Sequence, residues 1–303
     1  MADLNKFSAQ FGLPLVTTAT FKVVFAGGAD HCSGSSPGGD PGWETEQALD
    51  IEWAHAMAPK AKIFLVQAAS ASTTDLLVAE DCASKQVAAA GGGEISNSWG
   101  SSEFSTETSL ESHFQKAGVV YFASSGDSAG TIWPSISPNV VAVGGTTTAR
   151  INGGATFGNF LDETAWENGG GGSSLFEPRP SYQSVLPPAS HRLVPDVSSD
   201  ANPHTGVWVY DNNPTTGCCW LVIGGTSVSS PTWAGIVNSA GHFAASSSTE
   251  LTTIYGAYAV ASTYAADYND VTSGRCGFYD GFIATTKWDP CTGVGSPEGY
   301  VGK

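Results

Sequence analysis

The chain has 303 residues, with 12 Lys and Arg against 28 Asp and Glu, and a formal charge of −16 at pH 7. This acidic balance argues against a nucleic-acid-binding protein, because phosphate groups require a basic surface. Charged residues make up 13% and apolar residues 41%, and no apolar run approaches the roughly 18 residues that cross a bilayer, so we expect a soluble globular protein without a membrane partner.

Short apolar runs rich in β-branched residues alternate along the chain with stretches of helical period. The runs that predict strands are residues 21–26, 62–67, 94–99, 119–124, 139–143 and 220–223. The stretches that predict helices are residues 44–57, 74–90, 106–117 and 229–244. Continuous apolar strands separated by helices predict an α/β fold with a parallel central sheet flanked by helices.

Residues 145–216 show few helical signals and contain a run of four glycines at 169–172 and several turn-forming prolines. We expect long functional loops here, because the strand predicted at 220–223 resumes the earlier pattern. Residues 1–303 are then a single domain.

The six cysteines form no C-x-x-C pair, so three disulfides and an oxidising, extracellular location are expected for a secreted protein. Cys276 with Cys291 is the local pairing we expect first. The low fraction of charged residues suits an acidic medium, in which most carboxylates are protonated. Residues 1–13 lack the basic start and apolar core of a signal peptide.

Ser227 lies in a Gly-rich turn, Gly224-Gly225-Thr226-Ser227, between a predicted strand and a helix that Pro231 would start at its first turn. The helix dipole and free backbone N–H groups at such a position favour a nucleophile that must form an oxyanion beside it. A capping serine in an ordinary turn is an equally good interpretation.

A nucleophilic serine is usually activated by histidine. None of the six histidines is followed by glycine, so the His-Gly-Thr segment of a subtilisin-like enzyme is missing. We expect surface or packing roles for most of them: His31, His55, His113, His191, His204 and His242.

The first predicted helix offers carboxyl groups instead. At 100° per residue, Glu46 and Asp50 share one face with apolar side chains, where burial and mutual repulsion would raise one of their pKa values. Glu44, Glu52 and His55 fall elsewhere on the helix and are expected to be solvated. The alternative is that Glu46 and Asp50 only reach the rim of the core.

Asp127 follows the strand predicted at 119–124, within Ser125-Gly126-Asp127-Ser128. The carboxyl ends of parallel strands line the ligand crevice of an open sheet, so Asp127 is a third candidate site residue. An aspartate after glycine is also an ordinary turn residue.

Together these segments resemble the sedolisins, the serine-carboxyl peptidases, whose fold is similar to that of subtilisin. The resemblance covers residues 11–297 and rests on five short motifs that occur in the family's order. They are Glu46-x-x-x-Asp50 with Met57-Ala58-Pro59, Ser96-Asn97-Ser98-Trp99-Gly100, Ser125-Gly126-Asp127-Ser128, Gly225-Thr226-Ser227 with Pro231, and Asn269-Asp270-Val271 with Trp288-Asp289-Pro290.

The resemblance implies an acid-acting endopeptidase that forms an acyl-enzyme on Ser227. Glu46 would be the general base, Asp50 the acid that orients it, and Asp127 the oxyanion-hole residue. Trp99 would lie beside the acid pair, or in the core. The implied partners are polypeptide substrates, bound between residues 98–100 and 169–172, and the enzyme's own propeptide; we expect a monomer.

The resemblance also implies one structural calcium ion near the C-terminus. Its ligands would be the side chains of Asp270 and Asp289 with the backbone carbonyls of Val271, Thr285 and Lys287, an oxygen-only set that suits a hard cation. The family's Gly-x-Gly-x-Asp is here Thr-Thr-Lys-Trp-Asp. Ordinary loop acids are the alternative.

Relatives carry an inhibitory propeptide and a further sheet strand before the segment that matches residues 11–14. This chain starts at Met1 with neither, so we expect the N-terminal strand of the family to be missing. The alternative functions are a subtilisin-like Ser/His/Asp peptidase and a catalytically silent peptide-binding relative. The second is disfavoured because all four matched catalytic positions are filled.

Overall fold

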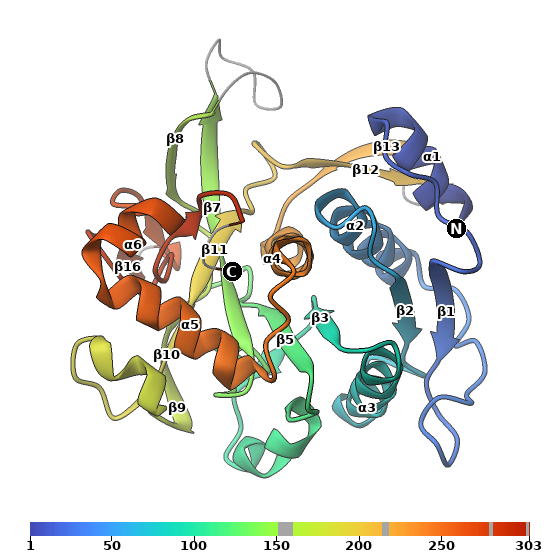
Figure 1. The fold of residues 1–303 in the computed structure, drawn as a ribbon, viewed down its shortest axis with the longest axis horizontal. Helices are drawn as coiled ribbons and strands as arrows, with labels where there is room; N and C mark the ends of the chain where they lie inside the picture. The colour runs from blue at the N-terminus through green and yellow to red at the C-terminus, as the bar shows by residue number, and fades with distance from the viewer. Residues whose placement is uncertain (151–159, 214–217, 279–280, 301–302) are drawn as a thin grey trace.

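The computed structural model describes residues 1–150, 160–213, 218–278, 281–300 and 303. Its helices (Figure 1) are α1 (Ala2–Phe11), α2 (Pro41–Met57), α3 (Thr73–Ala89), α4 (Thr226–Ala240), α5 (Ser247–Ala259) and α6 (Ala261–Asp267), with 3₁₀ helices η1 (Glu107–Phe114) and η2 (Ser181–Val185). Its strands are β1 (Phe21–Phe25), β2 (Ile63–Gln67), β3 (Gly93–Asn97), β4 (Ser101–Ser102), β5 (Val119–Ser124), β6 (Ile132–Trp133), β7 (Val141–Arg150), β8 (Phe160–Ala165), β9 (Gly172–Pro178), β10 (His191–Val194), β11 (Val197–Asp200), β12 (Val207–Asp211), β13 (Cys219–Ile223), β14 (Tyr268–Asn269), β15 (Arg275–Cys276), β16 (Phe282–Ile283) and β17 (Ser296–Pro297).

The central sheet is parallel, as predicted. Its strands lie in the order β3, β5, β7, β11, and β8 adds an antiparallel pairing to the far part of β7. β1 and β2 also pair in parallel, as a separate two-stranded sheet. The α/β fold with a parallel-rich sheet flanked by helices is therefore confirmed.

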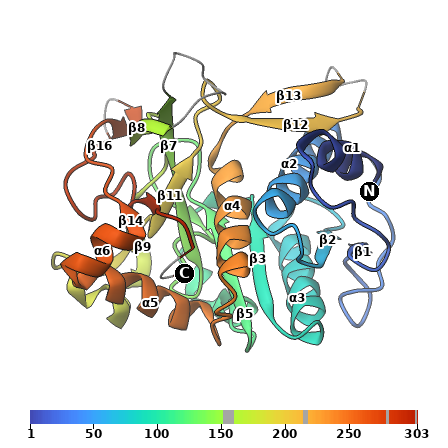
Figure 2. The same cartoon turned by 45° about the horizontal axis from the view of Figure 1, so that its top comes forward.

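Helices cover both faces of the central sheet. Alternate residues of β5 and β7, including Val120 and Val141, pack against Trp233 of α4 and Leu251 of α5. The intervening residues pack with Leu77 of α3 and with η1 on the opposite face. This follows from the alternation of side chains along a strand. α4 lies at the centre of the molecule in both views (Figures 1 and 2).

Two of the strand predictions need correction. The run at 220–223 forms β13, which pairs antiparallel with β12 in a ribbon outside the central sheet, and does not resume the parallel pattern. Residues 145–216 hold β8 to β12 as well as loops. A short apolar run does not reveal its partner, and here Val209 of β12 finds its apolar neighbours on α2 and α4.

The predicted helices differ from the observed ones mainly at their ends. α4 begins at Thr226, so Pro231 lies inside the helix and not in its first turn. The helix predicted at 106–117 is the 3₁₀ helix η1, and the predictions missed α1, α5 and α6.

Glu52 and His55 are buried, contrary to the prediction that they are solvated. Glu52 Oε2 accepts a hydrogen bond from the Tyr210 amide of β12 at 2.9 Å, and His55 Nε2 lies 2.8 Å from the carbonyl oxygen of Pro14. The ribbon and the segment after α1 cover this face of α2, which a helical wheel cannot show.

All six cysteines pair. The predicted Cys276–Cys291 disulfide is present, and the others join Cys32 to Cys82 and Cys218 to Cys219. None of the helices in the described part of the chain is long and apolar enough to cross a membrane.

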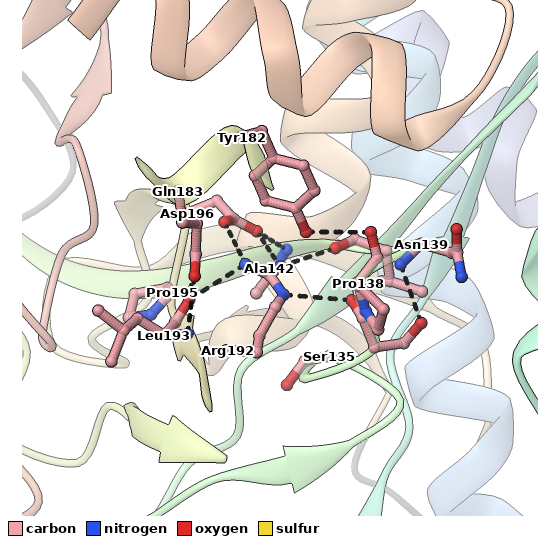
Figure 3. Close-up of polar contacts among 12 residues, drawn as sticks. Ser135, Pro138, Asn139, Ala142, Tyr182, Gln183, Arg192, Leu193, Pro195 and Asp196 are labelled. Atoms are coloured by element: carbon pink, nitrogen blue, oxygen red, sulfur yellow. Dashed lines mark hydrogen bonds and ion pairs between the residues drawn. The ribbon is translucent and has the colours of Figure 1, made fainter. Parts of the chain in front are cut away.

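A fully buried ion pair joins the start of β10 to the loop before β11 (Figure 3). Arg192 Nη1 and Nη2 donate to the two carboxylate oxygens of Asp196 at 2.7 and 2.6 Å. Asp196 also accepts from the Ala142 amide and the Tyr255 hydroxyl, and Arg192 also donates to the Val140 carbonyl. These bonds tie the segment 192–196 to β7, to the residue before it and to α5.

Replacing Arg192 with methionine will lower the free energy of unfolding by about 3–5 kcal/mol, because Asp196 is left buried without its cation. For a chain of this length the melting temperature falls by about 5–8 °C. Calorimetry measures the change, with Arg275→Met as a matched control, since Arg275 is exposed. A loss below about 1 kcal/mol would show that Asp196 does not depend on Arg192.

Candidate active site

The structure brings Glu46 and Asp50 of α2 next to Ser227, the second residue of α4. The start of α2 is fixed by Asp40, whose Oδ1 accepts from the Gly42 and Trp43 amides at 3.0 and 3.1 Å. One turn separates Glu46 from Asp50, so both carboxyl groups face the same side of the helix.

Ser98, directly after β3, connects the acid pair to α4. Its Oγ lies 2.6 Å from Asp50 Oδ1 and 3.3 Å from the Ser227 carbonyl oxygen. That carbonyl is available because Pro231, four residues later, has no N–H to donate to it. The proline inside α4 therefore has a structural role that its expected position in the first turn did not suggest.

The environment of Glu46 suits a proton acceptor. Burial raises the pKa of Glu46 to about 7, while hydrogen bonding from the Ser227 and Ser98 side chains acts in the opposite direction. Burial, followed by the charge of Glu46, raises the pKa of Asp50 well above its ordinary value. Glu46 Oε1 has no hydrogen-bond partner within the described residues, so one oxygen remains able to accept a proton.

Asp127 lies at the N-terminus of α4. Its Oδ1 accepts from the Thr226 amide and the Thr226 hydroxyl, both at 2.8 Å. Gly225, at φ 103°, permits this approach, because a Cβ there would lie 2.6 Å from Asp127 Oδ2. Asp127 lies on an exposed loop, and its carboxyl group is held against Thr226, the residue that precedes Ser227.

The two segments expected to bind a substrate strand, residues 98–100 and 169–172, also have contacts that fix their positions. Gly170 donates to the Gly126 carbonyl at 2.8 Å and Gly171 to the Gly130 carbonyl at 2.9 Å, so residues 169–172 flank Asp127. Trp99 packs edge-on against Trp133, with ring centroids 5.7 Å apart, in the cluster that includes Ile95. This packing agrees with the alternative that Trp99 belongs to the core.

The sequence resemblance places Ser98 beside a bound substrate but does not connect it to the acid pair. Ser98 belongs to the motif Ser96-Asn97-Ser98-Trp99-Gly100, but a serine that follows a strand does not indicate which carboxyl group it contacts. The packing of α4 against both β3 and α2 brings the side chains of Ser98 and Asp50 together.

No histidine hydrogen-bonds to the Ser227 side chain within the described residues. His31 and His113 both pair with Asp81 of α3, at 3.0 and 2.8 Å, and His55 is buried against Pro14. These contacts give a Ser/His/Asp triad no support.

The predicted calcium ligands also lie together, near α6. Asp270 accepts from the Lys287 amide at 2.9 Å, and Asp289 accepts from four donors, among them the Thr285 amide at 3.1 Å. Carboxylates with backbone carbonyls are the ligands that Ca²⁺ takes. Asp270 has spare lone pairs, whereas Asp289 would have to exchange a protein donor for the ion. The described residues contain no group of three or more His, Cys, Asp or Glu placed to hold a metal, so carbonyls such as that of Val271 would have to contribute.

The chain is similar to several known proteins. It is 29% identical to sedolisin of Pseudomonas sp. (strain 101) over 98% of its own length and 54% of the relative's, and 32% identical to kumamolisin of Bacillus sp. (strain MN-32) over 88% and 51%. The chain therefore spans about half the length of these curated relatives. No protein-family model matches it.

Solved structures agree with this similarity. Pseudomonas sedolisin, a serine-carboxyl proteinase complexed with two molecules of pseudo-iodotyrostatin, superposes with a TM-score of 0.78 at 28% identity, covering 98% of this chain and 85% of that one. Sphericase, at 21% identity and a TM-score of 0.54 over 79% and 69%, shares the fold alone.

Proposed function

Because the chain belongs to the sedolisin family, we propose that it is an acid-acting serine-carboxyl endopeptidase. The observation that carries the proposal is the buried acid pair, Glu46 and Asp50, joined through Ser98 to the turn of α4 that presents Ser227.

In the proposed mechanism, the Ser227 hydroxyl attacks the carbonyl carbon of a peptide bond as Glu46 accepts its proton. The tetrahedral intermediate collapses to an acyl-enzyme when Glu46 returns that proton to the leaving amine, and a water molecule then releases the second product by the same steps. Asp50 holds Glu46 in place and shares its proton. Asp127, when protonated, donates to the oxyanion.

Cleavage of an unfolded protein at about pH 4, with new amino termini identified by mass spectrometry, tests this activity. Activity that depends on one of the six histidines would instead support the subtilisin-like alternative. Binding of peptides without cleavage would support the silent relative.

The pH profile of cleavage depends on two opposite requirements. Asp127 must keep a proton to donate a hydrogen bond, whereas Glu46 must lose one to act as a base. We expect a bell-shaped profile with its maximum below neutrality, whose limbs belong to the coupled acids together. Asp127→Asn supplies a donor that does not titrate, so its remaining activity will extend to higher pH than that of wild type. An active Asp127→Asn enzyme with an unshifted upper limb would remove Asp127 from this role.

One structural calcium ion is a further part of the proposal, held by Asp270, Asp289 and the carbonyls of Val271, Thr285 and Lys287. The ion would offset the repulsion between the two carboxylates. Calcium at 100 times its Kd adds about 2.7 kcal/mol to the free energy of unfolding, or about 4 °C in melting temperature, and a chelator reverses the gain. Protein that is shown to be free of metal and melts at the same temperature with and without calcium would contradict the site.

The proposed partners are polypeptide substrates, lying between residues 98–100 and 169–172 as a paired strand, and an inhibitory propeptide. Three disulfides support an oxidising compartment, so we propose that the protein is secreted and acts there as a monomer.

A further inference from the structure

A cavity of about 800 Å³ lies between β2 and β3, in the middle of the strand layer. All five residues of β2 line it, as do Glu94–Asn97 of β3. α2 closes the cavity on one side, with Ala54 and the C-cap residue Ala58, and α3 on the other, with Ala79 and Ala83. Figure 1 shows this arrangement, with β2 and β3 apart and the two helices on opposite sides.

The edge of β2 that faces the cavity carries unpaired backbone groups. Ile63 donates to the Thr20 carbonyl and Gln67 accepts from the Ala26 amide, both at 2.8 Å, so the odd-numbered residues of β2 bond to β1. Because the bonding direction alternates along a parallel strand, Phe64 and Val66 direct their N–H and C=O groups away from β1 and toward the cavity.

The facing edge of β3 is unpaired in the same way. Gly93 donates to the Gly118 carbonyl beside β5 at 3.0 Å, so the odd-numbered residues of β3 bond to β5. Glu94 and Ser96 therefore direct their backbone groups toward the cavity. Two strand edges with the same two-residue repeat thus face one another across it.

The two edges also run in the same direction. At the carboxyl end of β2, Gln67 Nε2 lies 2.5 Å from Gln47 Oε1 of α2. At the carboxyl end of β3, Ser98 contacts Asp50, one turn along the same helix. Both strands end at the same stretch of α2, so a third strand can lie parallel to both.

We propose that this cavity binds an uncharged, apolar polypeptide segment in extended conformation, which pairs with β2 and β3 in parallel and joins the two sheets into one. Pairing satisfies the amides and carbonyls of Phe64, Val66, Glu94 and Ser96, which are costly to leave unpaired once water is excluded. Five residues of such a strand extend about 17 Å and place β2 and β3 about 9.6 Å apart, twice the usual strand spacing.

The lining determines the chemistry of the segment. Helices cover both sides of the cavity, so the segment needs apolar side chains in both directions, as in a central strand of a parallel sheet. Glu46, Asp50, Glu80 and Glu94 also line it, whereas Lys62, the basic residue of the lining, is exposed, so an acidic residue would be buried without a cationic partner. Burial raises the pKa of Glu80 to about 8 and of Glu94 to about 7, so neither offers a charge to a basic residue in acid.

A synthetic peptide with the sequence of residues 139–145, NVVAVGG, tests the proposal, because it copies an uncharged and largely buried strand segment of this chain. The experiment uses Ser227→Ala protein, so that the probe is not cleaved. Hydrogen exchange at single amides should slow at least about tenfold at Phe64, Val66, Glu94 and Ser96 when the peptide is present. The amides of Ile63 and Leu65, already bonded to β1, should change much less.

Matched controls separate strand pairing from other binding. The same peptide with proline at its centre lacks a ladder donor and should give no protection. Ala83→Leu, which narrows the cavity, should weaken binding at least about tenfold relative to Ala89→Leu on the exposed side of the same helix.

Three results would overturn the proposal. The first is unchanged exchange at the four amides in Ser227→Ala protein without a cavity substitution, a result that does not depend on how the Ala83→Leu and Ala89→Leu variants fold. The second is binding that protects only residues around Ser227, which would identify the substrate cleft. The third is protection of the four amides by raising the protein concentration alone, which would make a second copy of the chain the occupant.

Discussion

Ser227→Ala will lower kcat for cleavage of an unfolded protein by about 10⁶-fold without changing the fold, because it removes the proposed nucleophile. Glu46→Gln removes the base and Asp50→Asn the group that orients it, and each should cost at least about 10⁴-fold. Any two of these substitutions together should cost little more than one, since the three groups act as a unit. Product formation at about pH 4, followed by mass spectrometry, measures the loss.

The matched control is Ser239→Ala, an exposed serine about 18 Å further along the same helix, which should retain wild-type kcat. Melting curves of all the variants show whether a loss of kcat comes from the chemistry or from a loss of folded protein. A Glu46→Gln enzyme with near wild-type kcat would show that Glu46 does not accept the proton of Ser227.

The free energy of unfolding will fall by about 5 kcal/mol or more as the pH rises from 4.5 to 8. Burial raises the pKa of Glu52 to about 9, of Glu80 to about 8 and of Glu250 to about 7. The salt bridges among the described residues involve only the acids Asp81 and Asp196, so none of these three carboxyl groups has a cationic partner in an ion pair. Between the unfolded value near 4.5 and these raised values the folded protein binds more protons, so stability is greatest in acid and is lost with rising pH.

Melting temperatures of Ser227→Ala protein at the two pH values measure this effect without self-cleavage, and should differ by about 8 °C or more. Glu80→Gln should reduce the difference, because a neutral amide cannot ionise, whereas Glu167→Gln on the surface should leave it unchanged. A melting temperature that is equal or higher at pH 8 would show that the buried acids ionise without cost.

The sequence predicted the parallel sheet because a strand buried on both faces is apolar at every position. β5, whose six residues are all buried, was located for this reason. β1 and β2 were also located to within one residue from their apolar runs, although they carry exposed or half-buried residues. The same signal misplaced β13, because an apolar run is compatible with a ribbon packed on α2 as well as with a central strand. The burial of Glu52 depends on that ribbon, so it could not be predicted from a sequence analysis that did not predict the ribbon.

The meeting of Glu46, Asp50 and Ser227 was predicted from the shared face of one helix and from a family resemblance. The periodicity of residues 44–57 put both acids on one side, and packing of α2 against α4 brings that side to Ser227. The sequence gives no distances, so the contact of Ser98 with Asp50 and the carbonyl left free by Pro231 required the structure.

The central position of α4 has a consequence for the order of events during synthesis. This helix contacts β3, β5, β7 and β11, yet it is made only after all four of them. Until residue 240 leaves the ribosome, the strand residues of this cluster lack the α4 side chains Trp233, Ala234 and Val237. The chain must close its core through contacts distant in sequence, which makes folding slow. Ser227 lies on the same late helix, so the proposed nucleophile meets Glu46 and Asp50 of α2 only when this core closes.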